Sequence, residues 1–249
     1  MKVNSIFVAL LLLVAGLQTA MAQKMIVTLN DNSKVTYSIS QVKEVSFVES
    51  DEHEYVDLGL PSGTKWATCN VGANSPEEYG DYFAWGETKP KSTYDWSTYK
   101  WCNGSSKTMT KYCTRSDYGY NGFTDNLTEL QPEDDAATAN WGSGWQMPSL
   151  DQIKELLNSS YTTTKWTQLN GVKGRMITSK SNGNSIFLPY AGGRRDGELY
   201  YAGNHGNYWS SSLYPSYDYD ACYLYFGSDF WSWSGNYRSY GHSVRAVRP

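Results

Sequence analysis

The sequence contains few of the side chains that metal sites and nucleic-acid interfaces need. Its three histidines, His53, His205 and His242, lie far apart, and no Cys-x-x-Cys pair occurs. A zinc site needs three or four converging ligands, so we interpret the histidines as ordinary loop residues and expect no cofactor. The formal net charge is -4. Because phosphate binding depends on clustered Lys and Arg, nucleic acid is not expected as a partner.

Motifs of common catalytic sites are also missing. There is no Gly-x-Ser-x-Gly nucleophile motif and no complete phosphate-binding glycine loop. Asp218 and Asp220 are near neighbours in sequence, but this proximity does not set the spatial separation that a pair of hydrolytic carboxylates requires. The sequence therefore offers no positive support for an enzyme, and a non-enzymatic protein is predicted.

Only the N-terminus carries a long apolar run. Residues 6–17 are apolar apart from small residues, and Ala20 and Ala22 follow. This layout predicts a signal peptide over residues 1–22, cleaved between Ala22 and Gln23; a buried N-terminal helix is the alternative. No later segment approaches the length of about 20 residues that crosses a bilayer. We therefore expect an exported chain without a transmembrane segment after signal removal, located in the periplasm, on the cell surface or in the medium.

The four cysteines leave the disulfide pattern open. Three fully paired arrangements are possible for Cys69, Cys102, Cys113 and Cys222. Cys102 and Cys113 enclose the short polar segment NGSSKTMTKY and would form the easiest local bridge in an oxidising compartment. Alternatively all four stay reduced, with Cys69 and Cys222 packing as small core residues.

The chain divides by composition into a small β segment and a larger domain. In residues 23–50, MIVTL and KVTYSIS flank a polar turn at residues 30–33, and VSFV follows. β-Branched residues around such a turn predict a β-hairpin, with a third short strand possible. The acidic residues 49–54 resemble a linker. Residues 54–249 then form the predicted main domain.

The main domain has one convincing helix and many short strands. The helix is SLDQIKELLNS, in which Ser149 can cap and apolar residues repeat on one face. PEDDAATAN, from Pro132, is a weaker candidate. Its acidic run could bind calcium, but negative charge at a helix start is the preferred interpretation. SIFLPYAG, NYWSSS, ACYLYFG and SVRAVR indicate strands. The predicted class is α+β, with one or two helices and long loops.

Aromatic residues are the most unusual feature of the composition. They make up 15% of the chain, with 21 tyrosines and 10 tryptophans, and crowd into its last part among glycines and serines. Tyr, Ser, Gly and Asn with Trp anchors are typical of antibody paratopes, because they combine contact area with adaptable hydrogen bonding. Exposed aromatic patches mark interaction sites. The alternative is that these rings pack on neighbouring strands, as expected for Phe226 and Trp209.

Strand alternation in ACYLYFGSD assigns side chains to two faces. The predicted core face carries Cys222, Leu224 and Phe226, and the predicted outer face carries Ala221, Tyr223, Tyr225, Gly227 and Asp229. Val244 and Val247 are further predicted anchors. The ligand-binding residues predicted on one C-terminal face are Tyr217, Tyr219, Tyr223, Tyr225, Asp229, Trp231, Trp233, Tyr237 and Tyr240.

Three stretches together resemble a known family: EYVDLGLPSGTKWATCNVGA from Glu54, NWGSGWQMPSLDQIKELL from Asn140, and the tail YGHSVRAVR. They look like the Fibrobacter succinogenes major paralogous domain family, which implies a C-type lectin-like fold over residues 54–249. WQMPSLDQI is also similar to a segment of formylglycine-generating enzymes, keeping Trp145 and Pro148 but departing at Gln146 and Ser149. Those enzymes use two late cysteines, whereas this chain has only Cys222.

These observations predict an exported, non-enzymatic binding protein of the cell envelope, similar to an adhesin. Its ligand would be a glycan, stacked on Trp231 or Trp233, or a protein. The resemblance also implies that the tail could be a target of diversity-generating retroelements, which rewrite adenine-containing codons. The alternatives are an enzyme of the formylglycine-generating or glycan-hydrolase type, or a structural envelope component.

Overall fold

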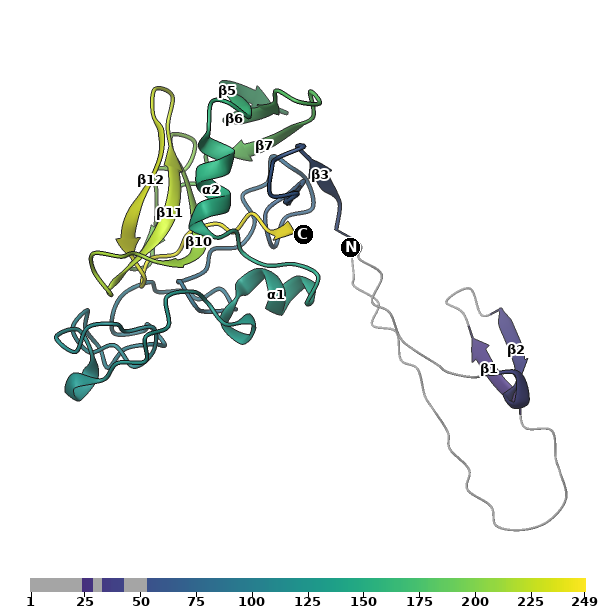
Figure 1. Ribbon diagram of the computed structural model, residues 1–249, viewed down its shortest axis with the longest axis horizontal. Coiled ribbons are helices and arrows are strands. Elements are labelled where there is room, and N and C mark those ends of the chain that lie inside the picture. Colours follow the sequence, from purple (N-terminus) through teal and green to yellow (C-terminus); the bar gives the residue numbers. More distant parts are fainter. Residues whose placement is uncertain (1–23, 29–32, 43–52) are drawn as a thin grey trace, which may run out of the picture. The chain divides into compact units, whose positions relative to one another are not determined.

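The computed structural model describes residues 24–28, 33–42 and 53–249 (Figure 1). The chain divides into two compact units, Met1–Glu49 and Ser50–Pro249. The predicted signal peptide, its cleavage site at Ala22 and Gln23, and the possible third strand of the first unit lie outside the described residues. Within the described ranges, no helix is both long enough and apolar enough to cross a membrane.

The first unit contains the predicted hairpin. Strands β1 (Lys24–Thr28) and β2 (Lys34–Ser38) pair antiparallel, and a 3-10 turn, Ile39–Gln41, follows. Their register places apolar side chains on one face, in the opposed pairs Met25–Tyr37 and Val27–Val35. Val27, Val35 and Tyr37 are exposed, so this unit leaves apolar surface open to solvent. A two-stranded hairpin alone is marginally stable in water.

The second unit is mainly β structure, so the predicted α+β class is wrong. Across the described parts of the chain there are thirteen strands but only two α-helices. The helix predicted from Ser149 forms as α2 (Leu150–Leu157), whereas the candidate at Pro132 gives a 3-10 turn, Pro132–Asp134, and a short α1 (Ala136–Trp141). The α+β, C-type lectin-like architecture is therefore replaced by small antiparallel sheets.

Two strands of one sheet were not predicted although their turn has a strong sequence signature, whereas the third strand is the predicted SIFLPYAG. Strands β5 (Thr162–Leu169), β6 (Val172–Ser179) and β7 (Ser185–Pro189) pair antiparallel in that order. Asn170 and Gly171 join β5 to β6 with φ values of 49° and 83°. Asn-Gly is the favoured pair for a tight hairpin turn, because both positions need positive φ.

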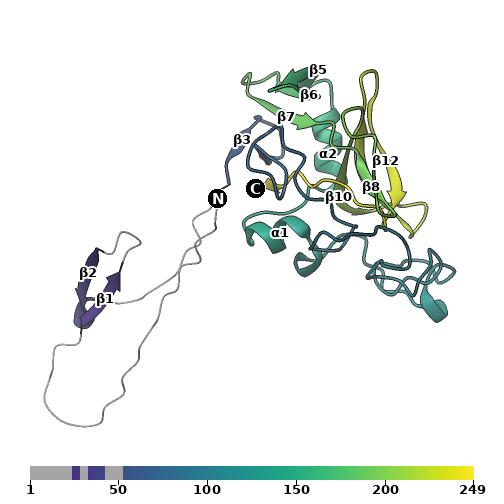
Figure 2. The ribbon, with the colours of Figure 1, turned by 180° about the vertical axis from the view of Figure 1, so that it is seen from behind.

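The central sheet consists of β10 (Gly206–Leu213), β11 (Asp220–Phe226) and β12 (Trp231–Tyr237), in that order and antiparallel. Helix α2 lies in front of this sheet in Figure 1. The view from behind shows β8 on the opposite side (Figure 2). Strand β8 (Gly193–Arg195) pairs with β9 (Glu198–Tyr200). The central sheet therefore separates the helix from the β8–β9 hairpin.

The chain termini of the second unit meet in a third sheet. It has the order β13 (Val247–Arg248), β4 (Lys65–Ala67) and β3 (Tyr55–Asp57). Arg245 is 1% exposed, and its guanidinium donates to the carbonyl oxygens of Ala67, Thr68 and Phe187 and to Asn70 Oδ1. The first arginine of the SVRAVR segment, Arg245, thus joins the C-terminal chain to two distant segments. A 3-10 turn, Tyr120–Gly122, belongs to the long irregular segment between β4 and α1.

Each α-helix begins at a side chain that caps its first backbone amides. Ser149 Oγ accepts from the backbone N–H of Gln152, and the Gln152 side chain accepts from the Ser149 N–H, which completes a capping box. Asp135 caps α1 by accepting from the amides of Ala137 and Thr138. The acidic run before α1 therefore lies at a helix start, which was the preferred interpretation of this run. Asp134 of the same run contacts Lys111 Nζ at 2.6 Å.

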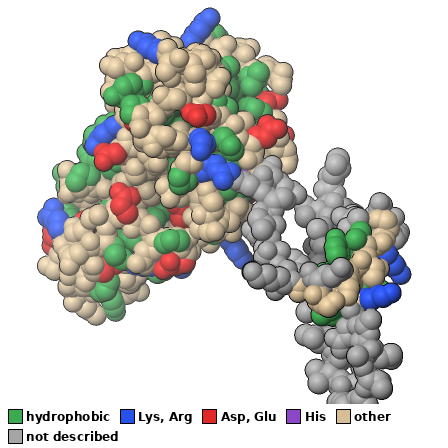
Figure 3. Space-filling model, turned by 45° about the vertical axis from the view of Figure 1, so that its right-hand side comes forward, with side chains coloured by type: hydrophobic (Ala, Val, Ile, Leu, Met, Phe, Trp, Pro, Cys, Tyr) green, Lys and Arg blue, Asp and Glu red, His purple; other side chains and the backbone are tan. Residues whose placement is uncertain are grey.

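The core confirms the anchors expected from the sequence. The predicted anchors Leu224, Phe226, Val244 and Val247 are buried, and Trp145 and Met147 beside them in the core are each 2% exposed. Ile153 and Leu156 of α2 pack in one cluster with Leu224 and Phe226. On the face shown in Figure 3, the charged and hydrophobic side chains of the described residues are interspersed.

Candidate functional site

The two faces of the central sheet have different neighbours. Tyr223 lies opposite Trp209 on β10 and Ser234 on β12, and Tyr225 lies opposite Asn207 and Ser232. We call this side, which looks toward β8, the tyrosine face. Leu224 and Phe226 point to the other side together with Trp233 and Trp231, their partners in the register. We call that side, which packs against α2, the helix face.

The residues predicted to form one binding surface are therefore divided. Trp231 and Trp233 lie on the helix face, where both pack against the core cluster that contains Leu224 and Phe226. The Trp231 and Phe226 ring centroids are 5.4 Å apart, and Lys154 Nζ lies 5.4 Å from the Trp233 ring. The predicted glycan platform at Trp231 and Trp233 is thus on the opposite side of the sheet from Tyr223 and Tyr225.

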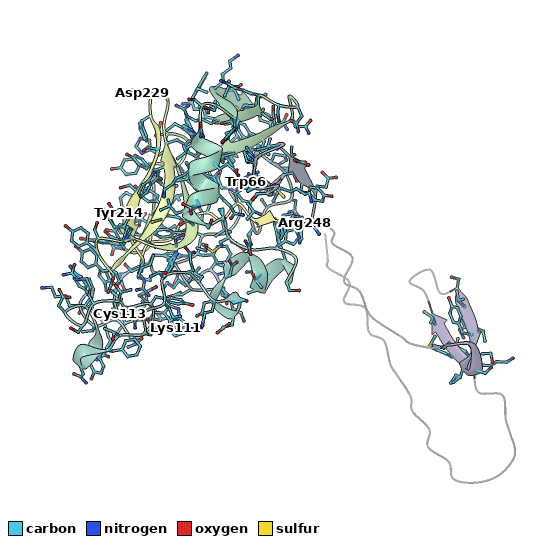
Figure 4. The ribbon with its side chains drawn as sticks, viewed as in Figure 1. Trp66, Lys111, Cys113, Tyr214, Asp229 and Arg248 are labelled. Carbon is cyan, nitrogen blue, oxygen red and sulfur yellow. The ribbon has the colours of Figure 1, made fainter. Side chains whose placement is uncertain are left out.

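The remaining predicted residues lie at two ends of the sheet. Asp229 is at the tip of the turn between β11 and β12, distant from Tyr214 (Figure 4). At the other end, aromatic rings contact each other from Tyr217 through Tyr219 and Tyr237 to Tyr240, with centroid distances of 5.2, 5.7 and 5.3 Å. Tyr240 also borders the tyrosine face, so the row of contacting rings extends from Tyr217 to that face.

A pocket of about 280 Å³ lies between the tyrosine face and the β8–β9 hairpin. Strands β10, β11 and β12 contribute Asn207, Tyr223, Tyr225 and Asn236. The other lining residues are Gly193, Arg194, Arg195, Tyr200, Tyr201, His205, Phe230, Tyr240 and His242. Of the predicted ligand-binding residues, only Tyr223, Tyr225 and Tyr240 are brought together here. The pocket is thus mostly aromatic, with amide and guanidinium groups among the rings.

The tyrosine face is only partly open because a core cluster covers one end. Trp209 and Ala221 are both 0% exposed and belong to a cluster with Phe83 and Trp85. Ala221 was expected to face outward, and this prediction is wrong. The segment around Phe83 and Trp85 covers Ala221, whereas Tyr223 and Tyr225 remain half-buried beside the pocket.

His242 supports the floor of the pocket as a neutral ring. Its Nδ1 lies 3.0 Å from the Gly241 carbonyl oxygen, which can only accept, so Nδ1 carries the proton and Nε2 accepts from Asn236 Nδ2 at 3.1 Å. Burial lowers the pKa of His242 to about 3. The ring stacks on Tyr223 at a centroid distance of 5.3 Å, and Tyr223 stacks on Tyr225 at 5.3 Å. Burial raises the pKa of Tyr223 to about 12, so its phenol remains a donor at neutral pH.

Arg195 is one of two arginines that line the pocket, next to Arg194. A Cβ at the neighbouring Gly193 would lie 2.8 Å from His242 Nδ1, so glycine allows β8 to approach the sheet closely. The Arg195 guanidinium carbon lies 4.6 Å from the Tyr200 ring centroid and 5.9 Å from that of Tyr240. Hydrogen bonding to these two tyrosines raises the pKa of Arg195. Two aromatic side chains thus hold a permanent positive charge at the pocket rim.

The cysteines lie in separate surroundings. All four cysteines are free, so of the two alternatives the Cys102–Cys113 bridge does not form. The two thiols point to different acceptors: Cys102 Sγ to the Trp96 carbonyl oxygen and Cys113 Sγ to that of Arg115. Cys222 is buried, and burial raises the pKa of its thiol to about 12. Over the described residues, no group of His, Cys, Asp and Glu side chains forms a candidate metal site.

Several pocket residues were not predicted from the sequence. They include Arg195, Tyr200, Tyr201, His205, Asn207, Phe230, Asn236 and His242. One signal was available: Asp196-Gly197 lies between β8 and β9, and Asp196 has a φ of 53°. Asp-Gly marks tight hairpin turns, so the segment RRDGELYY could have been recognised as a hairpin carrying Arg195 and Tyr200. No local pattern predicts that this hairpin lies over the tyrosine face.

No family model matches the chain, and neither the curated proteins nor the solved structures include a match.

Proposed function

We propose that this protein binds glycans without catalysing a reaction, and that the pocket between the tyrosine face and the β8–β9 hairpin holds a sugar unit. The observation that carries the proposal is the pocket lining, in which stacked tyrosines lie beside Asn207, Asn236 and Arg195. A sugar ring has apolar C–H faces and a hydroxyl edge. Aromatic rings suit the faces, and amide and guanidinium groups suit the hydroxyls.

The size of the pocket supports a small ring. Its volume of about 280 Å³ is below the roughly 300–1,000 Å³ typical of drug-sized ligands. The tyrosines are also positioned in advance, because Tyr223 is stacked between His242 and Tyr225, and Tyr225 contacts Phe230 at a centroid distance of 5.4 Å. Side chains that are already ordered lose less conformational entropy when a ligand binds.

The placement of carboxylates favours binding over glycan hydrolysis. Among the described residues that line the pocket there is no Asp or Glu, whereas most glycoside hydrolases use two carboxyl groups. Asp218 is 1% exposed and accepts from the amides of Thr114 and Arg115, so it holds a loop. Asp220 follows the alternation of the helix face, and burial raises its pKa to about 6. Neither residue of this sequence-adjacent pair lines the pocket.

A glycan array with one variant from each face of the sheet tests the proposal. The array should carry neutral and uronate-containing glycans, and the proteins should be wild type, Tyr225→Ala and Trp233→Ala. We expect wild type and Trp233→Ala to bind the same glycans, and Tyr225→Ala to lose at least about tenfold in affinity, equivalent to ~1.4 kcal/mol. Thermal unfolding of each variant confirms that the proteins are folded.

Two results would overturn this assignment. The first is that wild type retains none of the glycans. The second is that Trp233→Ala removes binding while Tyr225→Ala preserves it, which would move the site to the helix face.

A further inference from the structure

A second hollow adjoins the proposed sugar pocket. Its volume is about 690 Å³, and it shares Tyr201, His205 and Phe230 with the lining of the first pocket. The shared side chains form a ridge of rings: Tyr201 stacks on His205 at 4.9 Å, and His205 meets Phe230 edge-on at 5.3 Å. Because Phe230 contacts Tyr225, aromatic surface is continuous from the first pocket to the second hollow.

Tyr201 on this ridge is unusual in two ways. Its side chain is 62% exposed, although large aromatic side chains are generally buried. Its φ is +59°, in the left-handed region that bulky residues rarely adopt. The Tyr201 carbonyl oxygen accepts from the amides of Asn204 and His205, which holds the loop in this conformation. Such backbone outliers cluster at functional sites, where the surrounding structure maintains them.

The far wall of the second hollow is built from other strands. Trp166 on β5 is 43% exposed, and Lys173 on β6 lies beside it in the lining. The turn that carries Asp229 forms another side. Arg175 is 6% exposed and donates to the carbonyl oxygens of Gly227 and Ser228 at 3.0 and 2.9 Å. This buried arginine fixes the turn, so the second hollow has a defined wall.

We propose that the two hollows are adjoining subsites for one oligosaccharide. This inference rests on the proposed function. One sugar unit occupies the tyrosine pocket, the chain crosses the ridge at Tyr201, and following units contact Trp166 and Lys173. The two exposed rings give sugar faces to pack against, and Lys173, Asn204 and Asp229 give hydrogen-bonding groups for hydroxyls.

Affinity as a function of chain length tests the second subsite. The ligands are glucose, xylose and galacturonic acid, each with its linear dimers through hexamers, titrated into the full chain by calorimetry. Wild type should bind the longer members of a recognised series at least about tenfold more tightly than the monosaccharide. Trp166→Ala should remove most of this gain and leave the monosaccharide affinity unchanged within about twofold.

Two further variants separate the subsite from effects on folding. Tyr120 is 43% exposed, as Trp166 is, but it lies outside both hollows. Tyr120→Ala should therefore bind every ligand as wild type does. Tyr201→Asn removes the ridge ring with a residue that tolerates positive φ, and it should weaken the longer ligands about fivefold or more.

The outcomes distinguish the subsite from the proposed function. If a series binds but its affinity is independent of length, or if Trp166→Ala weakens monosaccharide and hexamer equally, the second subsite is disproved and the sugar pocket remains. If wild type binds no member of any series and also retains no glycan on the array, the proposed function fails, and the subsite fails with it.

Discussion

The tyrosine face and the helix face of the central sheet are built from alternate residues of the same strands, yet they have different surroundings. On β11, Leu224 and Phe226 are 1% and 0% exposed, whereas the intervening Tyr225 is half-buried. Helix α2 contributes Ile153 and Leu156 to the cluster that covers one face. The other face meets the β8–β9 hairpin and retains a pocket. The difference shows that aromatic content alone does not identify a binding surface.

Trp233 and Tyr225 illustrate this lesson. Both are aromatic, both are half-buried and both lie in the C-terminal segment. Trp233 packs against the core cluster and lies near the ammonium of Lys154, whereas Tyr225 lines a pocket. We therefore expect substitutions on the helix face to reduce stability and substitutions on the tyrosine face to reduce binding. The following predictions test that division, from the largest effect to the smallest.

Phe226→Ala should have the largest effect on stability. The ring is 0% exposed and packs against Tyr208, Tyr190 and Trp231, so its removal leaves a cavity in the helix-face core. We expect the free energy of unfolding to fall by about 3–5 kcal/mol. Urea denaturation followed by tryptophan fluorescence measures it. A loss below about 1 kcal/mol would show that the helix face is not a packed core.

His242→Gln should change how stability depends on pH. Folded His242 is neutral with a pKa of about 3, whereas the unfolded residue titrates near 6.5. The unfolded chain therefore binds the extra proton as pH falls below about 6.5, and folding loses stability down to about pH 3. Between pH 7 and pH 5, wild type should lose up to about 2 kcal/mol relative to the variant.

The pH dependence of wild type must be compared with that of His242→Gln, because Asp220 changes the pH dependence of stability in the opposite direction. Its folded pKa is raised to about 6 from 3.8, so protonation stabilises the folded state as pH falls through that range. Both proteins contain Asp220, and its contribution therefore cancels in the difference between them. A wild-type minus variant difference that is independent of pH would contradict a buried, neutral His242.

Trp233→Ala should reduce stability and leave binding unchanged, whereas Tyr225→Ala should reduce binding with little loss of stability. The two losses of free energy should be similar in size. For Trp233→Ala we expect about 1–2 kcal/mol less stability and unchanged glycan affinity, since the half-buried ring packs on the helix face. For Tyr225→Ala we expect at least about tenfold weaker binding with less than about 1 kcal/mol of destabilisation. Chemical denaturation and calorimetric titration on the same samples compare the two. Equal loss of affinity in both variants would remove the distinction between the faces.

Arg195→Gln should have the smallest effect. The exposed guanidinium is held by Tyr200 and Tyr240 and lies 3.8 Å from Asp196 Oδ2; we expect it to favour ligands with a carboxylate that replaces this loose, exposed pair. We expect affinity for uronate-containing glycans to fall about threefold to fivefold, with little change for neutral glycans. The salt dependence of uronate binding should also become weaker, because a charge pair is lost. An equal loss for neutral and uronate ligands would assign Arg195 to hydroxyl recognition.

Some elements could be predicted because their signals are local. The Ser149 cap, the buried Leu224 and Phe226, and the first hairpin follow from capping, alternation and turn chemistry. The β5–β6 and β8–β9 hairpins were not predicted, although each has a local signal, at Asn170-Gly171 and at Asp196-Gly197. The α+β class was wrong because long irregular segments and several short strands outweigh the two helices among the described residues.

The binding site could be predicted only in part. Tyr223, Tyr225 and Tyr240 were named from the sequence, and they line the pocket. Trp231 and Trp233 were placed with them because no register was known between β11 and β12. The family resemblance and the retroelement hypothesis stay predictions, the first over residues 54–249 and the second over the C-terminal tail.

The sequence by itself determined local features of this protein: its aromatic tail, its helix caps, its hairpin turns and the alternation of β11. These depend on residues close together in the chain. Only the tertiary structure decided which side of β11 is covered by α2 and which meets Arg195 and Tyr200 across a pocket. The physical reason is that alternation gives every strand two faces, whereas burial depends on which distant segment packs on each face.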